Sequence, residues 1–170
     1  MTASHEPASA AAPSDLLPLR PVRIGVSLAD LLATIAADVA ADRRSRGLPP
    51  VTIGVDAAAG HALPGDVATL RAGLLPLVAA ACEAAAGAAL ASDAPRLREV
   101  VITAVETGHG LEIEVADSGP GPVALAAAPL AAARSLSERL GGDVQVAACP
   151  EGGTAVTLRF PPRRQQSLAA

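Results

Sequence analysis

The chain has 170 residues, of which 51% are hydrophobic, and its formal net charge is -4. This length suits one packed domain with a single core, and the negative charge argues against nucleic acid or an anionic membrane as the main partner. A single Phe is the only aromatic residue, so stacking on nucleic-acid bases is nearly unavailable.

Neither the cysteines nor the basic residues form a recognisable site. Cys82 and Cys149 are far apart and lack metal-ligand spacing, so we expect two small buried hydrophobes. We interpret the basic cluster at Arg43, Arg44 and Arg46 as a solvated helix end. The sequence shows no signal-peptide pattern and no uninterrupted apolar run of about 18 residues, and we expect a soluble, cytoplasmic protein.

The N-terminal part predicts a tail, a strand and a helix. Residues 1–20 are rich in Ala, Pro and Ser without periodicity, which predicts a disordered tail. The pattern at 22–26 favours a short strand. Ser27, followed by Asp30 three residues later, resembles a capping box and opens a helix with one apolar face. A Gly-Leu-Pro-Pro run from residue 47 ends that helix.

A second strand and a longer helix follow. The strand is expected at 51–55, before a polar loop that holds His61. Asp66 can cap the helix through its carboxylate. Pro76 lies inside the helix, where it removes a backbone hydrogen bond and should kink the axis.

The second half of the sequence predicts two hairpins with a helix between them. The β-branched runs at 100–106 and 111–117 flank a Gly-His-Gly turn, which is typical of a hairpin. A helix begins near Pro129, a residue suited to the first helical position. The runs at 144–148 and 154–160 form the second hairpin. Together the elements predict an α/β two-layer sandwich, in which a mixed, mostly antiparallel sheet is covered on one face by about three helices.

Four local patterns occur in a fixed order along this scaffold: Gly65-Asp66 before Leu70-Arg71, LLPLVAAACEAA at 74–85, ADSGPG at 116–121, and a Gly-Gly, strand, Gly-Thr, strand sequence at 137–160. In this order they resemble the ATP-binding domain of sensor histidine kinases and its relatives in the gyrase, Hsp90 and MutL superfamily, which share the Bergerat fold. The resemblance implies one domain at 21–162, between the N-terminal tail and a C-terminal tail at 163–170.

The resemblance also assigns an adenine side to the site. It implies that Asp117 accepts a hydrogen bond from the adenine amino group, that Gly119 and Gly121 let the backbone pass close to the base, and that Thr154 belongs to the same binding set. The residues themselves allow another interpretation, in which the Asp-Ser-Gly-Pro-Gly run is a strand-ending turn and Thr154 is an ordinary strand residue. Both interpretations stay open.

The phosphate side departs from the family pattern. Pro76 and Ala80 stand where active members carry a polar base position and the Asn that holds magnesium, and neither offers the oxygen that Mg²⁺ prefers. Glu83 replaces a Lys that faces the phosphates, and it should repel polyphosphate unless the helix turns it into solvent. The second glycine box, which points backbone N-H groups at the phosphates, is replaced by Ala-Ala-Pro-Leu at 127–130, and the preceding lid is largely missing. We therefore expect no Mg²⁺ and no catalytic residue.

No histidine has the setting of a phospho-acceptor. His5 lies in the low-complexity tail, and no helical hairpin that would carry such a histidine is expected there. His61 and His109 lie in predicted loops without an identifiable Ser, Asp or Cys partner. We expect no catalytic role for any of them.

Two functions fit these observations. The first is a degenerate histidine-kinase-type ATPase domain that acts as a signalling or protein-binding module in a two-component phosphorelay, without ATP hydrolysis. Its partner would be a histidine kinase, a response regulator or, in a homodimer, a second copy of itself. The alternative is the catalytic ATP-binding component of a histidine kinase or phosphotransferase that works with a separate histidine-bearing partner. A third possibility, between these two, is that the domain binds ATP or ADP through Asp117 without catalysis. If the cleft beside Asp117 is filled by Leu125, Leu130 and their neighbours, the case for ATP ends.

Overall fold

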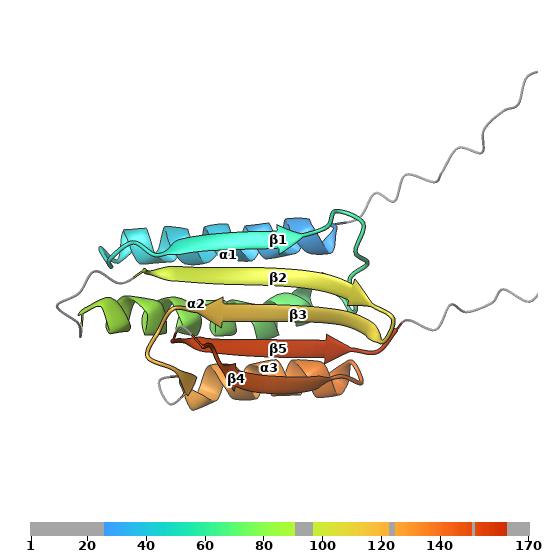
Figure 1. Cartoon of the computed structure of the whole chain (residues 1–170). Helices are drawn as coiled ribbons and strands as arrows, with labels where there is room; N and C mark the ends of the chain where they lie inside the picture. Colours follow the sequence, from blue (N-terminus) through green and yellow to red (C-terminus); the bar gives the residue numbers. More distant parts are fainter. Residues whose placement is uncertain (1–25, 91–96, 123–124, 151, 163–170) are drawn as a thin grey trace, which may run out of the picture.

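A five-stranded sheet covered on one face by three helices forms the fold (Figure 1). The computed structural model describes residues 26–90, 97–122, 125–150 and 152–162, and these counts refer to those residues. The helices and strands, in chain order, are α1 (Leu28–Ser45), β1 (Thr52–Ala57), α2 (Val67–Leu90), β2 (Glu99–Thr107), β3 (Gly110–Asp117), α3 (Ala127–Arg139), β4 (Asp143–Ala148) and β5 (Thr154–Phe160). The predicted two-layer α/β class is confirmed.

The sheet is mixed and mostly antiparallel, as the sequence predicts. Its strand order is β1-β2-β3-β5-β4. β1 and β2 pair in parallel, and the other three pairs are antiparallel. A parallel pair needs a long crossover connection, which α2 supplies between β1 and β2. The two hairpins, β2-β3 and β4-β5, are the ones expected from the β-branched runs.

The core lies between the sheet and the helices. Alternation along β3 buries Leu111, Ile113 and Val115, while Glu112 and Glu114 are only partly buried. Leu and Ile side chains on the inner faces of α1 and α2 are fully buried against this surface: Leu28, Leu32, Ile35, Leu70, Leu74 and Leu77. The apolar side chains that alternate along the strands therefore pack against the apolar faces of α1 and α2 in one core.

The other face of the sheet carries most of the acidic strand residues. Directly paired residues point to the same face of a sheet, and the pairing places these on the face away from the helices: Asp56, Glu99, Glu112, Glu114 and Asp143. Arg159 is paired between Glu112 and Asp143 in the register, and its Nε lies 3.2 Å from Glu112 Oε1. We call this surface the open face.

The helix ends follow local sequence signals. The Asp30 N-H donates to Ser27 Oγ at 3.1 Å and the Ser27 N-H donates to Asp30 Oδ2 at 3.3 Å, which confirms the capping box. α1 ends at Ser45, two residues before Gly47 with its φ of 65°. The Thr69 N-H donates to Asp66 Oδ1 at 2.8 Å, so Asp66 caps α2 as predicted.

The strand predicted at 22–26 and the predicted start of α3 both need correction. Of the strand predicted at 22–26, only Val26 is described, and it is in no strand and is 52% exposed. α3 begins at Ala127, so Pro129 is its third residue rather than its first. The first N-H groups of a helix have no intrahelical partner, so a proline is tolerated at that position as well. Both predicted tails, 1–20 and 163–170, lie outside the described residues.

α2 is a core helix with an unusually apolar composition. The stretch Val67–Gly87 is long and apolar enough to cross a membrane by length and composition alone. In this fold its inner face packs against the sheet, and Leu70, Leu74 and Val78 are fully buried. A mostly apolar helix in the centre of a packed layer has the same composition, so this stretch is explained by its place in the core.

Candidate functional site

A cleft of about 650 Å³ lies between α2 and the segment that follows β3. This volume falls within the roughly 300–1,000 Å³ of typical ligand pockets. Leu125 and Leu130 are partly buried against the core and do not line this cleft, and Asp117 does not line it either. The α2 wall consists of Pro76, Ala79, Ala80, Glu83, Ala84 and Gly87, and the opposite wall of Pro120, Ala126 and Pro129. Arg46, the C-cap of α1, also lines the cleft.

The α2 positions singled out from the sequence do face this cleft. Pro76 and Ala80 lie one turn apart and both line it. Neither side chain can coordinate a cation, since Mg²⁺ takes oxygen ligands. Among the described residues that line the cleft, Glu83 alone has a side-chain oxygen.

Glu83 is bound by an arginine of α1. Arg43 Nη1 donates to Glu83 Oε1 at 2.8 Å. The Arg43 side chain is 5% exposed and the Glu83 side chain 54% exposed. The expected repulsion of polyphosphate by Glu83 is thus reduced by a buried guanidinium, which sequence reasoning missed because the two residues are 40 positions apart.

Asp117 ends β3 and is almost fully buried. The Gly119 N-H donates to its Oδ1 at 2.7 Å. Burial raises the pKa of the Asp117 carboxyl, and hydrogen bonds from the backbone of Gly119 and Thr154 oppose that rise. Asp117 does not line the cleft beside α2; it lines a different pocket at the end of the sheet.

The glycines after Asp117 have local structural reasons. A Cβ at Gly119 would lie 2.6 Å from Asp117 Oδ1 and 3.0 Å from the Ala84 backbone carbon, so the turn packs directly on α2. Gly121 has a φ of 116°, which L side chains rarely adopt. The geometry of this turn therefore requires Gly at both positions even without a bound base.

Thr154 begins β5 beside this turn. It is 1% exposed, and its Oγ1 has no hydrogen-bond partner among the described residues. Buried hydroxyls nearly always have a partner. This atom is therefore an unused polar group next to the Asp117 carboxylate, and an adenine or a water could bind to it.

The start of α3 forms part of the opposite wall of the cleft. Ala126 is the N-cap and makes no side-chain capping bond. Pro129 also lines the cleft and has no N-H to donate. The helix N-terminus therefore presents fewer donors to a phosphate than a glycine-rich turn would.

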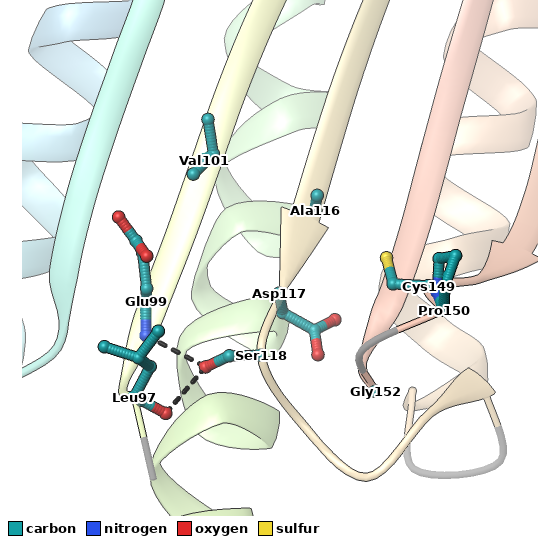
Figure 2. A pocket seen from close by; sticks show the side chains of 9 residues that line it. All are labelled: Leu97, Glu99, Val101, Ala116, Asp117, Ser118, Cys149, Pro150 and Gly152. Atoms are coloured by element: carbon teal, nitrogen blue, oxygen red, sulfur yellow. Dashed lines mark hydrogen bonds between the residues drawn. The ribbon is translucent and has the colours of Figure 1, made fainter.

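The pocket at the end of the sheet measures about 560 Å³ and is shown in Figure 2. Ser118 Oγ accepts from the Glu99 N-H at 3.0 Å and donates to the Leu97 carbonyl at 2.8 Å, which holds the turn after β3 against β2. Cys149 lines this pocket and is only partly buried, contrary to the expectation of a fully buried thiol. No sequence pattern around Cys149, which follows the end of β4, predicted that its thiol would be partly exposed.

The two described histidines stay apart from the cleft. His61 lies between β1 and α2, and its Nδ1 is buried without a partner in the described part of the chain. His109 is exposed in the β2-β3 turn. Within the described ranges, no three His, Cys, Asp or Glu side chains gather as a metal site would require.

Solved structures of histidine kinases have a similar arrangement. The ATP-binding domain of PrrB from Mycobacterium tuberculosis is 23% identical, with a TM-score of 0.56 over 82% of this chain and 96% of that one. This chain has the fold of a histidine-kinase ATP-binding domain. The catalytic domain of the histidine kinase ThkA, 18% identical, has a TM-score of 0.61 over 81% of this chain and 96% of its own.

A third similar structure is the cytoplasmic segment of the histidine kinase QseC, which is 14% identical and has a TM-score of 0.55 over 81% of this chain and 77% of that one. No protein-family model matches the sequence, and neither does any curated protein. The similarity to histidine kinases is thus one of structure rather than of sequence, and this structural similarity supports the predicted Bergerat fold. Of the positions that the sequence resemblance singles out, Pro76, Ala80 and Glu83 line the cleft beside α2, whereas Asp117 and Thr154 do not.

Proposed function

We propose that this histidine-kinase-fold domain is a binding module of two-component signalling that does not hydrolyse ATP. The observation that carries the proposal is the composition of the cleft wall. Pro76 and Ala80 line the cleft at the two positions where the resemblance places polar residues. A polyphosphate with its Mg²⁺ needs oxygen ligands and donors there, and these residues supply neither.

The rest of the cleft supports the same proposal. Ala79, Ala84, Pro120 and Ala126 add small apolar groups. The two charged lining residues are already paired, Glu83 with Arg43 and Arg46 with Asp42. An open apolar concavity favours contact with another protein over contact with a triphosphate. We propose a histidine kinase, a response regulator or a second copy of the chain as the partner.

Calorimetry tests the nucleotide part of the proposal. ATP and a non-hydrolysable analogue are titrated into the protein with and without Mg²⁺. We expect no Mg²⁺-dependent heat of binding. A micromolar, Mg²⁺-dependent affinity would overturn the proposal and favour the catalytic component of a histidine kinase or phosphotransferase.

A pair of matched variants tests the docking part. Ala84→Arg places a long cation in the cleft, whereas Ala147→Arg places the same side chain on the open face, where Ala147 is exposed. Retention of a purified response regulator or kinase should fall at least about tenfold for Ala84→Arg, which corresponds to ~1.4 kcal/mol. It should not change for Ala147→Arg. Analytical ultracentrifugation of the wild type separates the homodimer from the other partners, and a monomer that retains neither protein would contradict docking.

Thr154 supports a second candidate, which is adenine-nucleotide binding without metal. Its buried Oγ1 has no partner among the described residues and lies next to the Asp117 end of β3. If ADP binds through this pair, Asp117→Asn should abolish a weak affinity that EDTA leaves unchanged. The absence of ADP affinity in the wild type would exclude the candidate.

A further inference from the structure

A row of small or apolar residues crosses all five strands on the open face. The register aligns one such residue from each strand, and none of them is buried: Gly54, Val101, Ala116, Ala155 and Ala147. We call these five residues the apolar row. Neighbouring strands lie about 4.8 Å apart, so the row is about 19 Å long. Val101 and Ala116 also line the pocket at the end of the sheet, so the row leads into that pocket.

Carboxylates border the apolar row on both sides. Asp56 and Glu114 each lie two residues from the row in their own strands, on one side of it, and Glu99 lies two residues from it on the other side. Residues two positions apart in a strand share a face. Glu114 accepts a hydrogen bond from Thr157 Oγ1 at 3.0 Å. None of the three carboxylates has an ion pair with a described residue.

The unbalanced negative charge of the described elements lies on this face. The three helices carry five acidic residues and five arginines, so their charges cancel. On the open face, Arg159 is the single base among the described strand residues, and it is already bound to Glu112. A surface with unpaired charges of one sign attracts the opposite charge and repels its own. The open face therefore selects a basic partner.

Exposed apolar side chains add a second requirement. Val105 is 54% exposed and is paired with Glu112 in the register, and Leu97, at the pocket, is 72% exposed. Arginine meets both requirements, because its apolar stem covers hydrophobic surface while its charged head stays accessible. The planar guanidinium also fits the two oxygens of a carboxylate. Arginine stems can thus lie on the apolar row while their heads reach the bordering carboxylates.

We propose that the open face docks a basic segment of a partner protein, in which arginines alternate with small residues. The segment lies along the apolar row, and its guanidinium groups bind Asp56, Glu99 and Glu114. An extended segment of about six residues spans the row. This surface is separate from the cleft beside α2, because no residue of the row or its border lines that cleft.

Fluorescence anisotropy with a designed peptide tests this proposal. A labelled peptide of alternating Arg and Ala, about ten residues long so that it exceeds the row, is titrated with the full chain. We expect saturable binding that weakens at least about tenfold between about 0.05 M and about 0.5 M salt, because the carboxylates are accessible to ions. A peptide of alternating Glu and Ala should not bind. Amide shifts measured by NMR should concentrate in the strands rather than in α1, α2 and α3.

Two pairs of variants separate the open face from general charge attraction. Ala147→Arg adds a cation at one end of the apolar row and should weaken peptide binding at least about fivefold. Ala84→Arg adds the same charge in the cleft and should leave peptide binding unchanged. Likewise, Glu99→Gln should weaken binding, whereas Glu138→Gln, on the exposed side of α3, should not. Equal losses within either pair would overturn the proposal.

The same assay distinguishes the other occupants of this face. Arg163 and Arg164 make the C-terminal segment of this chain basic. If that segment occupied the face, replacing both arginines with Gln would strengthen peptide binding, and this result would overturn docking of a partner. The absence of saturable binding, or amide shifts confined to the helices, would overturn it as well.

Discussion

Two glycines of α2 should respond oppositely to the same substitution. A Cβ at Gly73 would lie 2.5 Å from Leu136 Cδ2 and 2.7 Å from Leu136 Cβ, whereas a Cβ at Gly87 meets nothing within 4 Å. Within a helix, Ala is favoured over Gly by ~0.5–1 kcal/mol. Gly87→Ala should therefore raise the free energy of unfolding by about that amount.

At Gly73 the helix preference for Ala is set against the free-energy cost of overpacking the core. Leu136 is 3% exposed on α3, and its Cβ is fixed to the backbone, so a rotamer change cannot relieve the contact. Extra atoms in a packed core cost ~1–3 kcal/mol. The middle of each range, about 2 kcal/mol of cost against about 0.75 kcal/mol of gain, gives a net loss of about 1 kcal/mol for Gly73→Ala.

Urea denaturation followed by far-UV circular dichroism measures both effects, since the chain has no Trp or Tyr for fluorescence. The shift in midpoint at constant m-value gives each change in the free energy of unfolding. A Gly73→Ala variant as stable as the wild type would refute the close packing of α2 on α3. A destabilised Gly87→Ala variant would refute the open surroundings of Gly87.

The charged and titratable groups give three more predictions. Glu83→Gln leaves the buried Arg43 without its charged partner and should cost about 1–2 kcal/mol in urea denaturation, less than the ~3–5 kcal/mol of a fully buried pair because Glu83 is half exposed. Because burial raises the pKa of Asp117, its stabilising contribution is present below the unfolded pKa of about 3.9 and is lost as pH rises through the folded pKa. Asp117→Asn should thus be more stable than the wild type near neutral pH and lose that advantage in acid. Burial also raises the pKa of Cys82 to about 11, so a disulfide reagent at about pH 8 should modify the partly exposed Cys149 far sooner than Cys82.

Each of these predictions has a control or a contrary result. Glu138→Gln, on the exposed side of α3, should change stability by less than about 0.5 kcal/mol. An Asp117→Asn variant less stable than the wild type near neutral pH would show that the carboxylate stabilises the turn. Equal reaction rates for the two thiols would contradict the burial of Cys82.

The elements could be predicted because their signals are local. The capping box of Ser27 and Asp30, the cap at Asp66 and the two hairpins each depend on residues a few positions apart. Apolar spacing then identifies which side of each helix meets the sheet. The start of α3 was placed two residues late because a proline fits several positions of a first turn.

The details of the site depend on contacts between distant elements. Arg43 was interpreted as part of a solvated helix end and Glu83 as a carboxylate that repels polyphosphate unless it is turned into solvent, because no local pattern links the two residues. Only the packing of α1 on α2 brings them together. Likewise, the Asp-Ser-Gly-Pro-Gly run predicted a turn at Asp117, but not that this side chain lines the pocket at the end of the sheet.

The charge of the open face affects self-association of this chain, in which 51% of the residues are hydrophobic. Uncovered sheets invite stacking, yet two copies stacked through this face would bring together two sets of the carboxylates of Asp56, Glu99, Glu112, Glu114 and Asp143. Arg159 alone offsets them among the described open-face strand residues. Repulsion between like charges therefore disfavours self-stacking there, and it leaves the helical side, with its apolar cleft, as the side on which a protein partner meets the least opposition.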